Sequence, residues 1–97
     1  MYDIIHDDGT IYIATESNPA GSVLMHVEVD KSKFCLSLYK ELLELIDLTA
    51  HMLKAEGVEE VFSIIPLADS TLNNFQRKMG MSPLIMSNTH TIYRRKL

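Results

Sequence analysis

The sequence predicts a mixed α/β (α+β) fold, in which a mostly antiparallel sheet carries one long central helix and one short helix. Three observations predict it. Residues 36–56 have the apolar spacing of a helix, each flank of that segment reads as a strand, and turn-forming residues separate further β-prone runs. A strand–helix–strand unit joins parallel neighbours with right-handed sense, so we expect the two flanking strands to lie side by side with the long helix packed on them.

The first three expected elements are strands. Residues 2–6 and 11–15 are β-prone runs separated by Asp7-Asp8-Gly9-Thr10, and Asp-Gly between such runs favours a hairpin. A turn-rich segment then leads into residues 23–29, where apolar and polar side chains alternate. This alternation indicates a third strand with one buried face.

The long helix has more apolar surface than one sheet face can bury. Its polar residues fall on one narrow stripe, whereas apolar side chains cover more than half of its circumference. Exposed apolar surface of this width is typical of protein interfaces. We therefore expect a partner surface on this helix, with Leu45, Leu48 and Met52 as the candidate interface residues.

Two glycines are placed to end the expected helices. Gly57 can cap the long helix in a left-handed conformation, and Gly80 can close a short helix over residues 71–79. Asp69 or Ser70 can cap the N-terminus of that short helix. The remaining C-terminal segments are expected as strands, at residues 61–65, 84–86 and 90–95.

Length and composition indicate one globular domain, residues 1–97, with 46% hydrophobic and 23% charged residues. The net charge of −4 and the lack of a basic patch outside the terminal Arg94-Arg95-Lys96 cluster argue against nucleic acid as a partner. No apolar run approaches the ~20 residues of a membrane span, and the N-terminus has no signal-peptide core. We therefore expect no membrane partner and a cytoplasmic location.

Two sequence phrases carry a resemblance to a known family. Ala-Glu-Gly-Val-Glu-Glu-Val, residues 55–61, leads from the long helix into a strand, and Asn-Phe-Gln-Arg-Lys-Met-Gly-Met, residues 74–81, leads into the final hairpin. With the order of elements from Ser22 to Arg95, these phrases resemble the GNAT superfamily of acetyltransferases. The resemblance implies the GNAT fold without the family's usual N-terminal strand and helices.

The same resemblance implies two functional positions that this sequence does not fill. The family holds the pyrophosphate of coenzyme A on an Arg/Gln-x-x-Gly-x-Gly/Ala loop before the long helix, expected here near Ser37–Leu42, yet residues 30–42 contain no glycine. The family's general acid is a tyrosine after the phenylalanine of the second phrase, whereas Phe75 is followed by Gln76, whose amide has no dissociable proton. We expect no catalytic residues and no cofactor.

Other candidate residues are assigned structural roles. His26 and Glu28 share one strand face, but alternation on a solvated strand explains both, and Tyr39 and Tyr93 are explained by packing. The four histidines lack the spacing of a zinc site, so we expect no metal.

The sequence therefore favours a non-catalytic GNAT-like structural or interaction protein. It resembles small degenerate GNAT-like virion proteins of tailed bacteriophages. This resemblance implies a protein partner, either itself or another virion protein, in an oligomer or larger assembly, and a location in the virion if the protein is viral. The alternative is a minimal N-acetyltransferase that uses acetyl-CoA and is completed by dimerisation.

Overall fold

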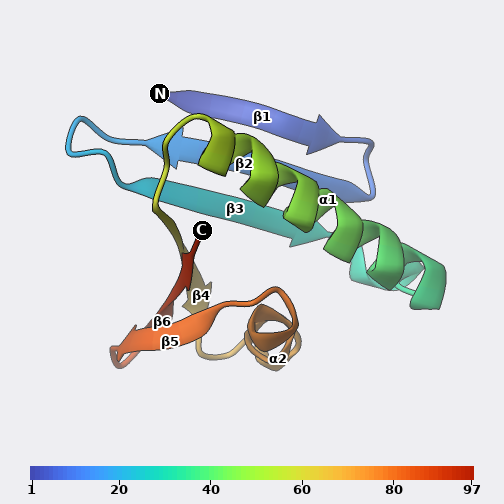
Figure 1. Cartoon of the computed structure of the whole chain (residues 1–97). Coiled ribbons are helices and arrows are strands. Elements are labelled where there is room, and N and C mark those ends of the chain that lie inside the picture. Colours follow the sequence, from blue (N-terminus) through green and yellow to red (C-terminus); the bar gives the residue numbers. More distant parts are fainter.

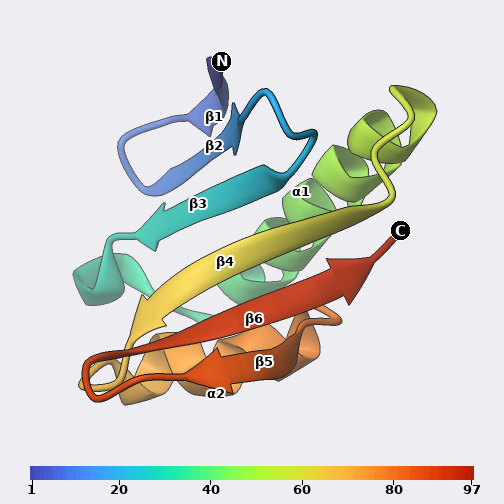
Figure 2. The same ribbon diagram turned by 90° about the vertical axis from the view of Figure 1, so that its left-hand side faces the viewer.

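The computed structural model of the chain has two layers, a six-stranded sheet and two helices that lie on the same face of it (Figure 1, Figure 2). The predicted fold class is thus confirmed; the division into a single domain, residues 1–97, stays a prediction. Neither helix combines the length and the apolarity needed to span a lipid bilayer. The elements are β1 (Tyr2–Asp7), β2 (Ile11–Ser17), β3 (Val23–Val29), a 3-10 turn (Lys31–Lys33), α1 (Leu36–Ala55), β4 (Glu60–Pro66), α2 (Ser70–Lys78), β5 (Ser82–Met86) and β6 (His90–Lys96).

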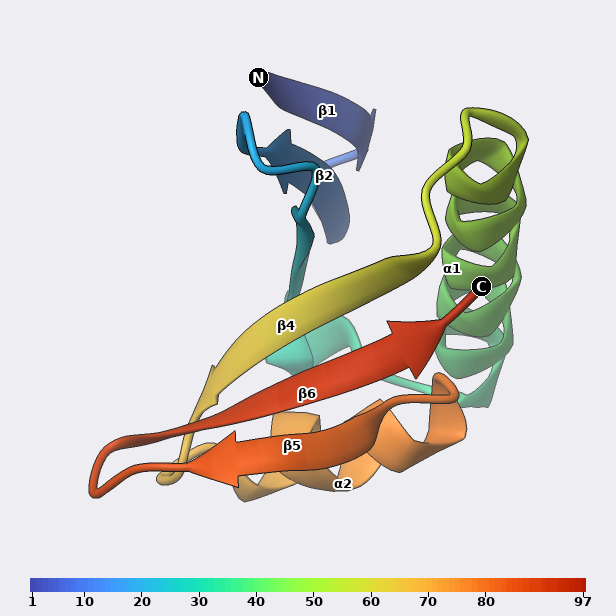
Figure 3. The ribbon, with the colours of Figure 1, turned by 60° about the vertical axis from the view of Figure 1, so that its left-hand side comes forward.

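The strand order is β1-β2-β3-β4-β6-β5, and every neighbouring pair is antiparallel except β3 and β4. Helix α1 is the crossover between these two parallel strands, as the sequence predicts. Helix α2 follows β4 and packs against the C-terminal half of the sheet, in a different direction from α1 (Figure 3). Each predicted strand and helix is present, with ends that differ by up to two residues.

The core lies between α1, α2 and one face of the sheet. Side chains spaced three and four residues apart on α1 turn inward, which is the periodicity of a helix packed on a sheet. On the strands the inward residues alternate, as expected for a sheet covered on one face. The buried apolar cluster consists of Ile11, Ile13, Val23, Met25, Leu38, Leu42, Ile46, Leu53, Val61, Ile65, Phe75, Met79, Met81 and Tyr93.

Arg95 joins the two helices to the last strand. Its Nη1 donates to the carbonyl oxygen of Met79 at the end of α2, over 3.0 Å, and to Asp47 Oδ1 on α1, over 3.3 Å. A cation near the C-terminal end of α2 also interacts favourably with the helix dipole. Gly80 has a φ of +78°, and a Cβ at this position would lie 3.3 Å from Nε of Arg95. Glycine therefore closes α2 as predicted, and it leaves room for the arginine.

The contrast between buried and exposed aliphatic residues on α1 gives a stability test. Ile46 is fully buried, whereas Leu48 is 57% exposed. Ile46→Ala removes buried methyl groups and leaves a cavity, so it should lower the free energy of unfolding by about 2–5 kcal/mol in urea denaturation. Leu48→Ala should change it by less than about 0.5 kcal/mol. Equal losses in the two variants would contradict the placement of α1.

Candidate functional site

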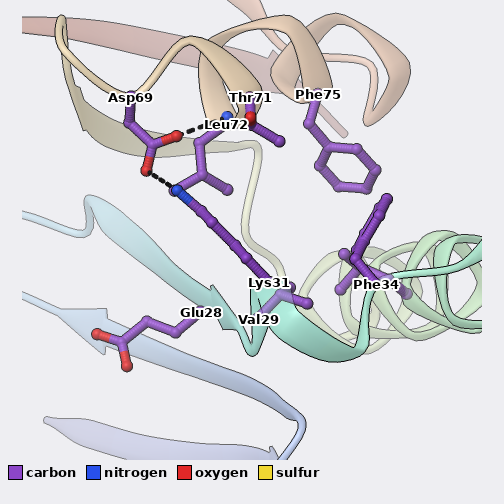
Figure 4. A pocket seen from close by; sticks show the side chains of 9 residues that line it. Glu28, Val29, Lys31, Phe34, Asp69, Thr71, Leu72 and Phe75 are labelled. Carbon is purple, nitrogen blue, oxygen red and sulfur yellow. Dashed lines mark hydrogen bonds and ion pairs between the residues drawn. The ribbon is translucent and has the colours of Figure 1, made fainter.

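A cleft opens where the two parallel strands separate. Strands β3 and β4 pair only at Val23 with Val61 and at Leu24 with Phe62, and they diverge toward their C-terminal ends (Figure 2). Ligand sites in α/β sheets commonly form at such carboxyl ends. The cleft holds a cavity of about 460 Å³. It is lined by Glu28, Val29, Lys31, Phe34, Leu42, Asp69, Thr71, Leu72 and Phe75 (Figure 4).

An ion pair crosses this cleft from one wall to the other. Lys31, just after β3, places its Nζ 2.9 Å from Oδ2 of Asp69, which precedes α2 (Figure 4). The other oxygen, Oδ1, accepts the backbone N–H of Leu72 over 3.0 Å and so caps α2, as the sequence predicts. These bonds, the one from Leu72 first and the one from Lys31 second, hold the pKa of Asp69 below its usual value. The carboxylate is therefore charged at neutral pH, and each of its oxygens is held by a hydrogen bond.

The polar groups of the loop between β3 and α1 form hydrogen bonds with one another. The carboxylate of Asp30 accepts the backbone N–H of Ser32 over 3.0 Å and the Ser32 hydroxyl over 2.6 Å, and these two bonds lower the pKa of Asp30. The N–H groups of Lys33 and Phe34 donate to the carbonyl oxygens of Asp30 and Lys31. Three consecutive amides are thus used within the loop, so they do not form an open nest for an anion.

The expected position of a phosphate loop near Ser37–Leu42 is wrong. Helix α1 begins at Leu36, so residues 37–42 are its first turns, and the connection from β3 to α1 is residues 30–35. The resemblance places that loop by the usual length of the family's helix, whereas α1 has 20 residues and begins earlier. The connection itself contains no glycine, as noted from the sequence.

The N-terminus of α1 is the one feature here that favours an anion. Cys35 occupies the N-cap without a side-chain hydrogen bond, and the first turn holds no acidic residue. The N–H groups of Leu36, Ser37 and Leu38 donate no hydrogen bond within the chain. Open N–H groups at a helix start attract negative charge.

Gln76 stands where the resemblance implies a tyrosine acid, and it does not face the cleft. It is 1% exposed, and its Oε1 accepts a hydrogen bond from the hydroxyl of Ser63 over 2.7 Å. The neighbouring Phe75 lines the cleft instead. The amide therefore satisfies a buried hydroxyl between α2 and β4, a structural role.

Neither alternative tyrosine supplies an acid to the cleft. Tyr93 is buried, and its hydroxyl donates to Oδ1 of Asn73 over 2.8 Å. Tyr39 packs edge-on against Phe34 and Phe75, with ring centroids 6.1 and 5.3 Å away. Packing thus accounts for both tyrosines.

His26 and Glu28 do not form an acid–base pair. His26 Nε2 lies 3.1 Å from Oε1 of Glu16 on the adjacent strand, an exposed contact. Glu28 lies at the edge of the cleft and points away from the Lys31–Asp69 pair (Figure 4).

The structure brings together one group of possible metal ligands that the sequence did not reveal. His6, Asp8 and Glu41 offer ligand atoms that all lie within 4.8 Å of one another, because the β1–β2 turn meets α1. However, Asp8 Oδ1 accepts the N–H groups of Thr10 and Ile11, each over 2.8 Å, and Oδ2 lies 3.1 Å from His6. The bonds to Ile11 and Thr10 lower the pKa of Asp8 to about 2. Turn formation explains this carboxylate, and we assign no metal.

The three candidate interface residues on α1 differ in exposure. Leu48 is 57% and Met52 43% exposed, one helical turn apart, whereas Leu45 is half-buried and packs against the core. The partner surface they were chosen for stays a prediction, and Leu48 and Met52 are its outward members.

Solved structures match the fold of this chain at low sequence identity. No protein-family model and no curated protein matches the sequence. Among solved structures, the PaiA N-acetyltransferase of Thermoplasma acidophilum in complex with coenzyme A matches with a TM-score of 0.76 and 16% identity, over 98% of this chain and 62% of that one. A GNAT-family acetyltransferase from Listeria monocytogenes matches with a TM-score of 0.68 and 13% identity, over 91% of this chain and 58% of that one.

A Bacillus subtilis acetyltransferase in complex with coenzyme A also matches, with a TM-score of 0.68, 12% identity and coverage of 94% of this chain and 71% of that one. The chain thus spans about three fifths of the length of the PaiA and Listeria enzymes. It has the fold of GNAT acetyltransferases, as the sequence resemblance implies.

The two roles of Asp69 can be separated by matched substitutions. Asp69→Asn keeps a cap for α2 but loses the ion pair, so at neutral pH it should cost at most about 0.5 kcal/mol, because Lys31 is 58% exposed. Asp69→Ala loses both and should cost about 1 kcal/mol or more.

The lowered pKa of Asp69 makes the stability contributed by its carboxylate depend on pH. The wild type should have a higher free energy of unfolding than Asp69→Asn. This difference should be largest above the ordinary aspartate pKa and should vanish as the pH falls through the lowered pKa of Asp69. Urea denaturation between pH 7 and pH 2 measures it. A difference that grows at low pH would contradict the ion pair.

Proposed function

We propose that this chain, which has the GNAT acetyltransferase fold, is a non-catalytic interaction protein. The observation that carries the proposal is the loop after β3, whose amides at Ser32, Lys33 and Phe34 are bonded within the loop. Binding of a diphosphate by such a loop depends on open backbone N–H groups. Coenzyme A therefore does not fit the residues present in this loop.

The cleft beyond the loop supports the same proposal. Acetyl transfer needs a proton donor for the leaving thiolate, and a general acid must lie within hydrogen-bond reach of the reacting atom. Gln76 cannot give up a proton and is bonded to Ser63, while Tyr93 is bonded to Asn73. In addition, Lys31 and Asp69 cross the cavity, so a ligand arm entering it would have to displace an ion pair.

The interaction role we propose is in a larger protein assembly. Leu48 and Met52 give α1 an apolar outer surface, which is the kind of surface that binds other proteins. Following the sequence resemblance, we propose that the assembly is the particle of a tailed bacteriophage and that α1 contacts another virion protein.

One observation favours a second candidate, a minimal N-acetyltransferase. The uncapped start of α1 leaves three N–H groups without a hydrogen bond, and Lys33 lies two residues before Cys35, the N-cap of the helix. An anion could be bound there by the helix dipole and a lysine. The two candidates differ in whether acetyl-CoA binds.

Thermal unfolding in the presence of acetyl-CoA decides between them. A ligand at ~100 times its dissociation constant stabilises a fold by ~2.7 kcal/mol, which raises the melting temperature of a domain of this size by more than about 10 °C. We expect no saturable rise up to millimolar acetyl-CoA. An acetyltransferase of the same fold serves as the positive control. A saturable rise that Lys33→Ala abolishes would refute the non-catalytic assignment.

The α1 surface is tested by placing a charge in it. Leu48→Glu should leave the circular dichroism spectrum unchanged, because the side chain is 57% exposed, but it should prevent incorporation into the assembly from which the native protein is isolated. Lys40→Glu, also exposed on α1, is the matched control for an added acidic side chain. Normal incorporation of the Leu48→Glu protein would show that the partner binds elsewhere.

A further inference from the structure

The face of the sheet opposite α1 and α2 has no helix on it (Figure 2). It carries several exposed apolar side chains. A sheet face exposed to water normally carries polar residues. Here four large apolar side chains on this face are about half exposed: Tyr2 at 52%, Ile4 at 59%, Ile64 at 49% and Ile85 at 59%.

Strand register assigns the members of this face. Residues directly opposite each other in paired strands point to the same side of the sheet. One row across all six strands follows from the pairing of neighbours. It reads Tyr2, Glu16, Leu24, Phe62, Arg94 and Ser82.

A second row lies two residues away from the first along the strands, or three residues away on β5, where the register shifts between Pro83 and Ile85. This row is almost entirely apolar. It reads Ile4, Ala14 and His26 on one half of the sheet, and Ile64, Ile92 and Ile85 on the other. Both rows therefore belong to one surface, which we call the open sheet face.

We propose that the open sheet face binds a second copy of this chain, related by a twofold axis parallel to the strands above the β3–β4 junction. Such an axis places β1 on β5 of the other copy, β2 on β6 and β3 on β4. The first row then sets Glu16 against Arg94 of the partner subunit, and symmetry repeats that pair. Leu24 meets Phe62 of the partner subunit. In the second row Ile4 meets Ile85 of the partner subunit.

The charges of the face favour this axis. The half formed by β1 to β3 carries the acidic residues Asp7, Glu16 and Glu28, and the half formed by β4 to β6 carries Arg94 and Lys96 with one acid, Glu60. An axis perpendicular to the strands would set the acidic half against itself, and like charges facing each other oppose association. The axis along the strands sets Glu16 against Arg94 of the partner subunit. Each of these residues also has a weak, exposed partner in its own chain, His26 at 3.1 Å from Glu16 and Glu60 at 3.8 Å from Arg94. The surface is thus complementary to itself, as a twofold interface must be.

The size of the face sets the expected affinity. Six strands about 4.8 Å apart and roughly five residues long make a surface roughly 25 by 17 Å, so two copies would bury on the order of 1,000 Å². This is at the low end of specific interfaces, so we expect a reversible dimer with a dissociation constant in the micromolar range. This proposal is independent of whether the cleft is catalytic.

Analytical ultracentrifugation of the full chain from about 5 to about 500 μM tests the dimer, since this range brackets micromolar dissociation constants. Ile64→Glu should raise the dissociation constant at least tenfold. Lys40→Glu is the matched control, because Lys40 is exposed on α1 in the opposite layer, and the change should alter the constant by less than twofold. Urea denaturation of both variants verifies that they fold.

A second test exchanges the charges of Glu16 and Arg94, and it applies even if the Ile64→Glu protein unfolds. Glu16→Arg and Arg94→Glu should each weaken the dimer by more than threefold, whereas the double variant Glu16→Arg/Arg94→Glu should return to within twofold of the wild type. A wild-type chain that stays monomeric at every concentration overturns the proposal. So does a dimer that Leu48→Glu, and not Ile64→Glu, dissociates, or a double variant no tighter than either single one.

Discussion

The early separation of β3 from β4 is the constraint on which the rest of the structure depends. After two paired residues the strands diverge, and the buried cluster formed with α1 and α2 joins the two halves of the sheet. The divergence creates the cavity, brings Lys31 within 2.9 Å of Asp69, and turns the two halves of the sheet relative to each other (Figure 2). Packing, the cleft and the open sheet face all follow from it.

Fold and site rest on different residues, so one can persist while the other changes. The GNAT fold is held by the apolar spacing of α1 and by the alternating strands, which need many residues of roughly the right size. Acetyl transfer needs a few polar groups in fixed places. At the positions that the resemblance implies for these groups, this chain bonds its polar groups to one another, with Asp30 bound to Ser32 and Gln76 bound to Ser63.

Most of the fold could be predicted from the sequence because its signals are local. Alternation in residues 23–29, the helical period after Leu36 and the left-handed glycines each act within a few residues. The loop position near Ser37–Leu42 was wrong because the resemblance placed it by the usual helix length of the family, whereas the helix of this chain begins at Leu36. The Lys31–Asp69 pair spans 38 residues, and the group at His6, Asp8 and Glu41 joins a turn to a helix, so neither has a sequence pattern. The open sheet face becomes visible only once the strand register is known.

We propose that the loop between β3 and α1, whose amides are bonded within the loop, does not bind coenzyme A. Amide NMR spectra of the chain titrated with acetyl-CoA test this residue by residue. The account predicts that the signals of Ser32, Lys33 and Phe34 keep their positions up to ~1 mM ligand, a concentration that would fill any site of moderate affinity. Saturable shifts of these three signals, together with those of Leu36, Ser37 and Leu38 at the start of α1, would contradict it.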